Sequence, residues 1–340
     1  MRVVVLGAGG RHKTEASIAR AIRGLGHACR LVNAVGWMRH AGPLGARAVR
    51  YLTDSFQPDY VLLTRHAIRI GESSLQALLR GREGAFWYFD FQPKSEVVTL
   101  GRVAGRMYTT SLSEVAALRA AGIPWVGFMP QGVDPEMDVP APAERPEDRC
   151  DVSFVGSGQY PHRYTVLSAV GAVARLQIRG PSWQDAPADL PVVGGPVYGT
   201  RLAQVIKGAA ISLGANAHAD QDTARASASN RIWKVLGCGG FFLGRWVEEI
   251  EYLAEGGRHC AWYRSPTDAA EQVRRYLREP EERARIASEG RAHALRHHSY
   301  SQRLRLMLAG KDYEMRRPVS HQRVVAELED PNAGQPLDHS

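Results

Sequence analysis

The sequence has few cysteines and no long apolar run, and both absences restrict the classes of protein it can belong to. The four cysteines stand far apart and form no CxxC pair, so we expect neither a structural zinc site nor a disulfide framework. No apolar stretch reaches the roughly 18–20 residues that a membrane-spanning helix needs. The opening MRVVVLGAGG predicts a first strand rather than a signal peptide. We therefore expect a cytoplasmic protein without a transmembrane segment.

The dinucleotide-binding fingerprint is also incomplete. The stretch GAGGRH supplies Gly7, Gly9 and Gly10, but His12 stands where the third glycine of GxGxxG belongs. The second predicted strand ends at Asn33, where an acidic residue would bind a ribose diol. These two departures disfavour an enzyme that uses a nicotinamide dinucleotide.

The charge balance is basic but carries no nucleic-acid signature. Lys and Arg number 43 against 35 Asp and Glu, a formal net charge of +8. This charge favours an anionic partner, such as a nucleotide, a phosphate, an acidic glycan, a membrane surface or a nucleic acid, or it is spread over solvated helix faces. Neither a zinc-finger spacing nor an RNA-recognition signature is present, so the charge alone does not indicate a nucleic-acid binder.

Predicted strands and helices alternate along the chain in two series, which predicts an α/β fold with two parallel-sheet domains. The first series begins with RVVVLGAGG, and the second begins with CDVSFVGSG after a segment rich in proline and charge. The βα alternation indicates parallel sheets with helices on both faces. We predict an N-terminal Rossmann-like domain at 1–133, a linker at 134–149, a second domain at 150–310 and a polar tail at 311–340. Because such sheets bind ligands at the carboxyl ends of their strands, two facing domains create a cleft.

The stretch SNRIWKVLGCGGFFL predicts a short helix that ends at glycines before a buried strand. Arg231 and Lys234 are three residues apart and share one face of that helix. Ser229 or Asn230 is expected to cap its first turn. A pair of cations at a helix N-terminus is suited to an anion, although a solvated surface pair has the same pattern.

Four segments together carry a resemblance to a known family: CDVSFVGSGQYPHR, VYGTRLAQVIKGAAISLGAN, SNRIWKVLGCGGFFL and the tail YLREPEERARIASEGRAHALRHHSYSQRLRLML. They resemble the GT-B glycosyltransferases of the spore maturation protein type, within the glycosyl transferases group 1 superfamily. The resemblance covers most of the second half. The first half matches mainly in YTTSLSEVAALRAAGIPWVGFMPQGVDP, which resembles the crossing from the acceptor domain to the donor domain.

The resemblance implies transfer of a sugar from a nucleotide-diphosphate sugar, with the donor in the C-terminal half and the acceptor in the N-terminal half. It also implies a reaction without a metal or other cofactor, because fixed cations and helix N–H groups stabilise the leaving diphosphate. Trp183 is a candidate for stacking on the base, although a lone tryptophan is more often packed in a core. The candidate diphosphate ligands are Gly156, Ser157, Arg163, Ser229, Asn230, Arg231 and Lys234.

The N-terminal half offers candidates for acid–base chemistry. The stretch GGRHKTEASIARAIRGLGHACRLV resembles the segment in which inverting GT-B enzymes place a histidine base, with His12 in that position. Asp90, at the end of a predicted aromatic strand, is a candidate to orient the imidazole. Alternatively, His12 binds phosphate or water and Asp90 caps a helix. Gly9, Gly10 and Arg11 form the expected acceptor-side loop.

Two features depart from the wider superfamily. Its Glu-x7-Glu pattern is replaced by Ala226 and Lys234, so retaining or inverting stereochemistry is not transferred to this chain. Asp220 and Asp222 form a DxD motif, which binds manganese in a different glycosyltransferase fold. Here the motif lies in a polar segment, and we interpret it as a solvated loop rather than a metal site.

Three functions remain open from the sequence. The motifs favour a metal-independent glycosyltransferase. A nucleotide-sugar-binding protein without turnover would keep the same cations, and a nucleic-acid-modifying glycosyltransferase would use the positive charge. The acceptor is undetermined between a glycan, a small molecule, a protein and a nucleic acid, and a peripheral membrane contact stays open.

Overall fold

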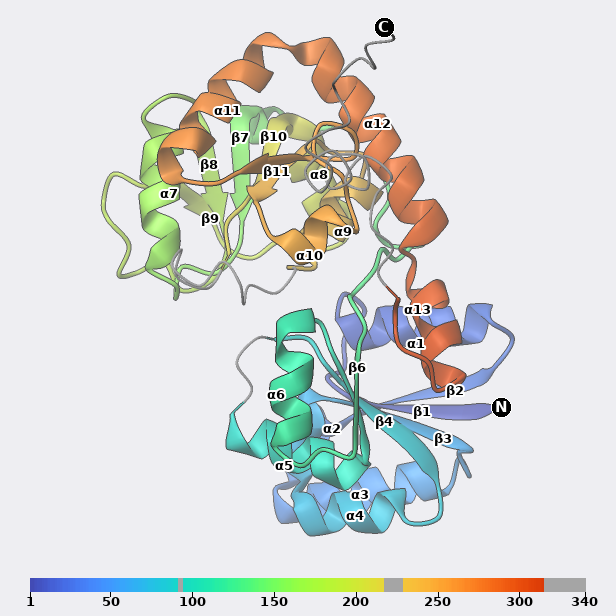
Figure 1. Cartoon of the computed structure of the whole chain (residues 1–340). Coiled ribbons are helices and arrows are strands. Elements are labelled where there is room, and N and C mark those ends of the chain that lie inside the picture. Colours follow the sequence, from blue (N-terminus) through green and yellow to red (C-terminus); the bar gives the residue numbers. More distant parts are fainter. Residues whose placement is uncertain (91–93, 217–228, 315–340) are drawn as a thin grey trace, which may run out of the picture.

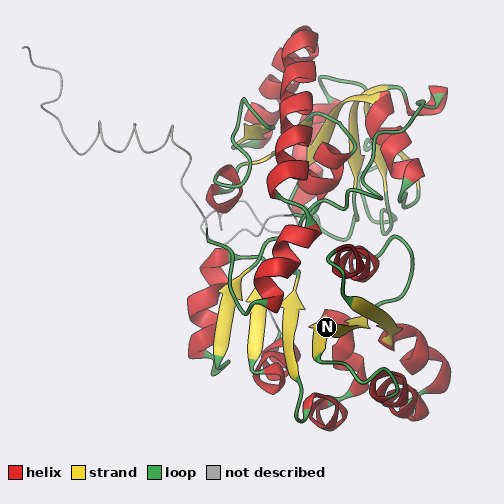
Figure 2. Ribbon diagram, turned by 90° about the vertical axis from the view of Figure 1, so that its right-hand side faces the viewer, coloured by secondary structure: helices red, strands yellow, loops and turns green. Residues whose placement is uncertain are grey.

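The protein consists of two α/β domains, each built on a parallel sheet of six strands (Figure 1). The structure is a computed structural model and describes residues 1–90, 94–216 and 229–314. Figure 2 shows the strands of the two sheets in separate halves of the molecule, with helices around each sheet. This arrangement confirms the predicted fold class of two facing Rossmann-like domains.

The N-terminal sheet has the strand order β2-β1-β3-β4-β5-β6. Its strands are β1 (Arg2–Gly7), β2 (Ala28–Asn33), β3 (Tyr60–Thr64), β4 (Glu83–Tyr88), β5 (Arg106–Thr109) and β6 (Trp125–Phe128). Its helices are α1 (Thr14–Gly24), α2 (Ala34–Ala41), α3 (Pro43–Asp54), η1 (Arg65–Ile70), α4 (Glu72–Leu79), α5 (Ser95–Ala104), η2 (Leu112–Glu114) and α6 (Val115–Ala120).

Alternate residues of the N-terminal strands enter two different cores, as the period of a strand requires. Val3 and Val5 of β1 pack with α1. Val4 and Leu6 pack with α3, α4 and α5 on the other face. An unbroken apolar run such as VVVL is therefore buried on both sides, as is typical of parallel sheets.

The C-terminal sheet has the order β12-β11-β10-β7-β8-β9. Its strands are β7 (Cys150–Val155), β8 (Leu176–Arg179), β9 (Val192–Gly194), β10 (Ala209–Gly214), β11 (Phe242–Arg245) and β12 (Ala261–Tyr263). Its helices are α7 (His162–Gly171), α8 (Thr200–Gly208), α9 (Arg231–Gly237), α10 (Glu248–Glu251), α11 (Pro266–Arg278) and α12 (Pro280–His297).

The chain crosses between the domains twice, and the two crossings are hydrogen-bonded to each other. The first follows β6, and the second joins α12 to the final helix α13 (Tyr300–Leu308). The Val133 amide donates to the His298 carbonyl at 2.8 Å, and the Tyr300 amide donates to the Val133 carbonyl at 3.1 Å. The two crossing segments are thus joined to each other where the chain passes between the domains.

The last helix differs from the domain boundary predicted at residue 310. Tyr300, Leu304 and Met307 of α13 are buried in the N-terminal core beside Val3 and Val5. Figure 1 shows α13 next to α1, separate from the C-terminal sheet. The apolar face of α13 thus completes the sheet on which the chain began, so residues 300–308 pack with the first domain.

The predicted linker contains a buried anchor. Asp148, in the short helix η3 (Pro146–Asp148), is fully buried and forms ion pairs with Arg179, at 2.9 Å, and with Arg201. These contacts hold the end of the linker against the C-terminal domain. Within the described ranges, no helix combines the length and the apolar character that crossing a bilayer requires.

Candidate active site

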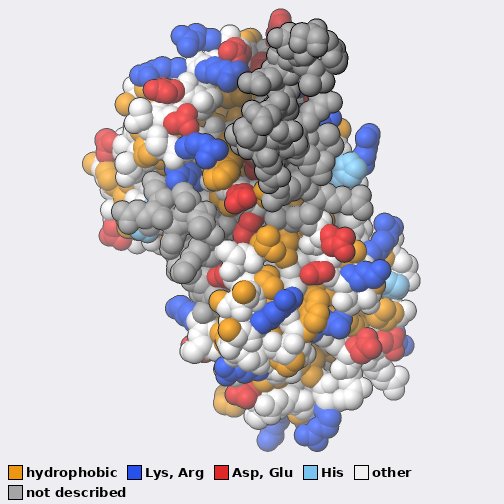
Figure 3. All heavy atoms as spheres, in the orientation of Figure 1, with side chains coloured by type: hydrophobic (Ala, Val, Ile, Leu, Met, Phe, Trp, Pro, Cys, Tyr) orange, Lys and Arg blue, Asp and Glu red, His pale blue; other side chains and the backbone are white. Residues whose placement is uncertain are grey.

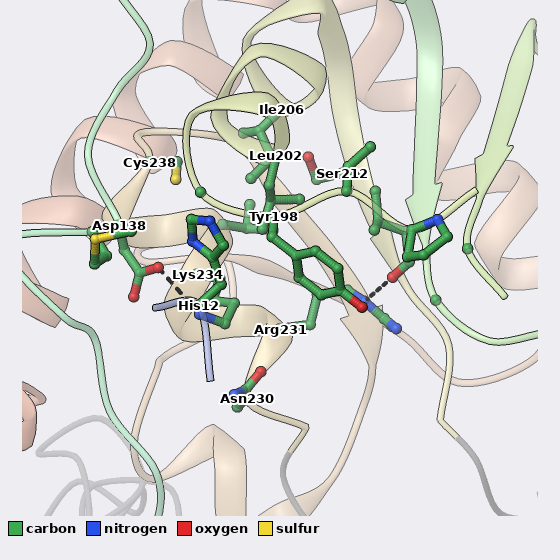
Figure 4. Close-up of a pocket in the computed structure, with 18 of the residues that line it drawn as sticks. His12, Asp138, Tyr198, Leu202, Ile206, Ser212, Asn230, Arg231, Lys234 and Cys238 are labelled. Carbon is green, nitrogen blue, oxygen red and sulfur yellow. Dashed lines mark hydrogen bonds and ion pairs between the residues drawn. The ribbon is translucent and has the colours of Figure 1, made fainter. Parts of the chain in front are cut away.

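A pocket of about 350 Å³ lies between the two domains (Figure 4). The segment before and within α1 supplies one wall, which includes His12, Lys13 and Arg20. The other wall comes from the C-terminal domain, from the turn after β7 and from α9. The pocket therefore lies where the carboxyl ends of strands from both sheets meet, the usual position of ligand sites in such folds.

The glycine turn after β7 is packed too closely to accept a side chain. A Cβ on Gly156 would lie 2.5 Å from Nη2 of Arg231, and one on Gly158 would overlap the Ser182 carbonyl oxygen. The Gly156 amide donates to the Arg179 carbonyl at 2.9 Å. Gly156 and Ser157 line the pocket, as expected of a turn that brings backbone close to a ligand.

Arg231 is a partly buried cation that lines the pocket and donates hydrogen bonds to backbone carbonyls. Its Nε donates to the Val155 carbonyl at 2.8 Å, and its guanidinium lies 4.6 Å from the centre of the Phe154 ring. Burial and the nearby positive charge of Arg163 lower the pKa of Arg231 to about 9. No carboxylate pairs with it in the described ranges. An anion in the pocket would relieve this electrostatic cost.

Arg163, predicted to bind phosphate, lies behind the glycine turn and does not line the pocket. Its Nη1 donates to the Ser157 carbonyl at 2.6 Å, and its Nε donates to the Ala215 carbonyl at 3.1 Å. Burial lowers the pKa of Arg163 to about 10. The prediction of a direct ligand is corrected here, because backbone carbonyls already accept from its donors. Arg163 positions the turn and adds positive charge behind Arg231.

Lys234 lines the pocket and carries a partner that the sequence did not predict. Its Nζ lies 3.3 Å from Oδ1 of Asp138, as Figure 4 shows. Burial raises the pKa of Asp138, and the adjacent ammonium of Lys234 opposes that shift. Asp138 belongs to the aperiodic linker, where no local pattern marks it as a pocket residue.

The start of α9 also faces the pocket, and its two polar residues have different partners. Ser229 Oγ accepts from the Arg231 amide at 3.3 Å, so it satisfies one amide of the first turn. Asn230 caps no amide with its side chain. Its Nδ2 instead donates to Gln131 Oε1 at 3.0 Å, which connects α9 to the segment after β6. The cap predicted for Ser229 or Asn230 is thus made by Ser229.

His12 and Asp90 do not form the predicted dyad. The ring of His12 lines the pocket and stacks on Tyr198 of the opposite domain, with 6.2 Å between ring centres. Asp90 forms an ion pair with Arg65 and lies outside the pocket lining. The Asp90 carboxylate pairs with Arg65, which follows the end of the neighbouring strand β3. The spacing of these residues in the sequence does not predict that pairing. The prediction that Asp90 orients His12 is corrected.

Asn33 hydrogen-bonds to the acceptor-side loop. This residue occupies the position where dinucleotide-binding proteins have a ribose-binding acid. Asn33 Oδ1 accepts from the amides of Gly9 and Gly36, each at 2.9 Å. Gly10 has φ +120°, a conformation that favours glycine. The carbonyl of Arg11 accepts from the guanidinium of Arg20 at 3.4 Å. This loop leads directly into His12.

Trp183, the candidate for stacking on a base, lies in a core and is not among the residues that line the pocket. Its side chain is 9% exposed and lies in the apolar core of the C-terminal domain. Its Nε1 donates to the Gly156 carbonyl at 3.0 Å, and its ring meets Phe154 edge-on. The tryptophan therefore supports the glycine turn from behind, and its position gives the stacking prediction no support.

Tyr198 is a pocket residue that the sequence reasoning missed. Its ring is 52% exposed, and it lies between two glycines in the segment GGPVYGT. A Cβ on Gly199 would lie 2.6 Å from Cε1 of His12, so this loop approaches the N-terminal domain closely. An aromatic residue flanked by glycines was the available signal.

The described part of the chain contains no cluster of three or more His, Cys, Asp or Glu residues that is suited to a metal ion. The DxD pair, Asp220 and Asp222, and the superfamily position Ala226 lie outside the described residues.

Comparisons with known proteins support the identity of this fold. HepE from Anabaena, in complex with UDP and glucose, superposes with a TM-score of 0.66 at 13% identity, covering 91% of this chain and 100% of HepE. The sucrose-phosphate synthase from Thermosynechococcus elongatus gives 0.67 at 12% identity, covering 96% and 100%. A glycosyltransferase from Rickettsia africae gives 0.62 at 10% identity, covering 91% and 97%. These similarities establish the GT-B fold.

The sequence of the second domain adds a similarity that does not depend on the fold. Residues 163–309 match the model of a family described as glycosyl transferase-like. This part of the chain, most of the second domain, is thus similar in sequence to glycosyl transferase-like proteins. No curated protein matches the chain in sequence. The matched range spans α9 and its cations, whereas the glycine turn at Gly156 lies just before it.

Proposed function

We propose that this protein is a glycosyltransferase that moves a sugar from a nucleotide-diphosphate sugar to an acceptor hydroxyl and needs no metal. The donor diphosphate occupies the pocket between the turn at Gly156 and Ser157 and the start of α9. Arg231 is its main cationic ligand, and Lys234 is a second one. The motif SNRIWKVLGCGGFFL supports assignment to the spore maturation protein type.

One observation carries the proposal: the guanidinium of Arg231 lies beside the glycine turn and has no carboxylate partner among the residues that the structure describes. A guanidinium that is buried among backbone carbonyls, with a second guanidinium behind it, creates a positive potential directed at the pocket. A diphosphate gains negative charge as the glycosidic bond breaks, so this potential stabilises the transition state more than the bound donor. Two of the structures similar to this chain, both of HepE, contain UDP with glucose or UDP-glucose. Uridine diphosphate sugars are therefore the first donors to test.

His12 is the candidate base on the acceptor side. Its imidazole lies in the pocket wall opposite Arg231, on a different domain. A histidine in this position can accept the proton of the acceptor hydroxyl while the sugar is transferred. The base does not depend on Asp90, since that carboxylate pairs with Arg65.

The nucleic-acid alternative receives no support from the face of the molecule that Figure 3 draws. On the face drawn in Figure 3, Lys and Arg side chains are interspersed with Asp and Glu and form no continuous basic stripe. A site for a nucleic-acid backbone is expected to show such a stripe.

The test is a panel of nucleotide sugars measured with and without EDTA. The matching donor should raise the melting temperature by mass action and release a nucleoside diphosphate in the presence of an acceptor. Stabilisation without release under any acceptor would favour the nucleotide-sugar-binding alternative. Turnover that vanishes in EDTA and returns with manganese would refute the metal-independent mechanism.

A further inference from the structure

The helix pair α2 and α3 presents exposed apolar and aromatic side chains that the glycosyl transfer site does not use. Trp37 is 41% exposed, Leu44 is 63% exposed and Tyr51 is 72% exposed. Exposed apolar side chains that gather on one face mark an interaction surface more often than scattered ones do. We define the α2–α3 patch as these three residues together with Arg39 and Arg47.

The two helices that carry the patch are packed closely against each other. A Cβ on Gly45 would lie 2.5 Å from the Trp37 carbonyl oxygen, so the start of α3 rests directly on α2. Leu44 and Tyr51 are seven residues apart, and Arg47 lies between them on the same outward face of α3. Val49 and Thr53 point to the opposite, buried side. The exposed face of α3 is therefore both apolar and cationic.

The cations of the patch are not neutralised by neighbouring acids. Arg39 and Arg47 are exposed, and neither forms an ion pair with any residue that the structure describes. The acid in the segment 34–54 is Asp54, and it pairs with Arg50 and Arg82. Aromatic and aliphatic side chains bordered by free arginines match the interface of an anionic bilayer, where rings insert and guanidinium groups meet phosphates.

The helix α3 of the patch lies on the side of the N-terminal domain that is remote from the C-terminal domain (Figure 1). Figure 1 shows α3 on the opposite face of the N-terminal sheet from α1 and α13, away from the C-terminal domain. The patch is also connected to the pocket through Asn33, which caps α2 and holds the Gly9 amide of the acceptor-side loop. A membrane that contacted α2 and α3 would thus lie near the acceptor side without touching the donor domain.

We propose that the α2–α3 patch docks this protein on an anionic lipid bilayer. The side chains of Trp37, Leu44 and Tyr51 enter the headgroup region, and Arg39 and Arg47 bind lipid phosphates. The docking is reversible, because three apolar side chains and two cations bury far less than a spanning helix.

The test measures co-sedimentation of the full chain with vesicles. One set contains phosphatidylcholine alone, and the other contains equal parts of phosphatidylcholine and phosphatidylglycerol. The parent should bind the anionic vesicles and bind the neutral vesicles much more weakly. The Arg39→Gln/Arg47→Gln variant should weaken anionic binding about 25-fold, at about fivefold for each cation. The Leu44→Ser/Tyr51→Ser variant should weaken it about tenfold or more.

Matched variants on the C-terminal domain control for net charge and exposed apolar area. Arg274→Gln/Arg278→Gln removes the same charge from the exposed face of α11, and Val192→Ser/Val193→Ser removes exposed apolar side chains from β9. Both controls should bind like the parent. Equal losses in patch and control variants would overturn the proposal, as would a parent that ignores anionic vesicles. A concentration-dependent dimer that only the patch variants abolish, without vesicle binding, would assign the patch to a second copy instead.

Discussion

Replacement of Arg231 by alanine tests the donor site most directly. The change removes a buried guanidinium that lines the pocket and leaves the glycine turn, Lys234 and His12 in place. A charge-assisted hydrogen bond to a buried anion is worth about 1.5–3 kcal/mol. Affinity for a nucleoside diphosphate should therefore fall about ten- to a hundredfold. Turnover should fall further than affinity, because the leaving diphosphate is more anionic in the transition state.

The assay separates lost charge from lost packing. Arg231 also donates to the Val155 carbonyl and covers the Phe154 ring, so its removal will lower stability to some extent. Calorimetric titration with the nucleoside diphosphate is therefore paired with titration of the nucleoside that carries the same base. A lost diphosphate contact lowers only the first affinity, whereas a distorted pocket lowers both. Circular dichroism at the assay temperature verifies that the variant is folded.

Lys234→Ala provides the matched comparison on the same helix. Its ammonium already has a partner in Asp138, so its removal should cost less diphosphate affinity than removal of Arg231. If the Arg231 variant keeps diphosphate affinity and turnover within twofold of the parent, the reasoning from buried charge is wrong. If both ligands weaken equally, Arg231 shapes the pocket without binding the diphosphate.

Three further outcomes are expected. His12→Asn should lower turnover by at least about a hundredfold with little change in donor affinity, whereas Asp90→Asn should keep the turnover of the parent. Steady-state kinetics measure turnover and calorimetry measures donor affinity. Equal losses of turnover in the two variants would support the His12–Asp90 dyad after all. Asp148→Ala should lower the free energy of unfolding by about 3–5 kcal/mol in urea titration, because it leaves two arginines without their buried partner; a loss below 1 kcal/mol would contradict this. Burial lowers the pKa of His259 to about 3. Below pH 6.5 the unfolded chain therefore binds a proton at this histidine that the folded chain does not bind. The free energy of unfolding should fall by about 2 kcal/mol between pH 6.5 and 5 for this reason. The His259→Gln variant should lose correspondingly less over that range in thermal unfolding, and an unchanged pH dependence would refute this.

Local sequence patterns determined the elements of this protein and part of its site. The alternation of apolar strands with helices predicts two parallel sheets. This prediction can be made from the sequence because the periodicity that indicates a strand or a helix extends over only a few neighbouring residues. The three-residue spacing of Arg231 and Lys234 places both on one helix face, and both line the pocket. The glycine turn at Gly156 is also predicted locally, and the structure leaves no room there for a Cβ beside the Arg231 guanidinium and the Phe154 ring.

Tertiary structure alone decided which charged group meets which partner. Lys234 pairs with Asp138, which lies 96 residues away in a linker without periodicity. Asp90 forms an ion pair with Arg65 and not with His12. Arg163 was predicted to contact the diphosphate, but it donates to the Ser157 carbonyl from behind the glycine turn. Long charged side chains can reach several neighbours, so spacing along the chain does not select among them. Packing of distant elements makes that choice, because it determines which donors and acceptors are buried together and must be satisfied.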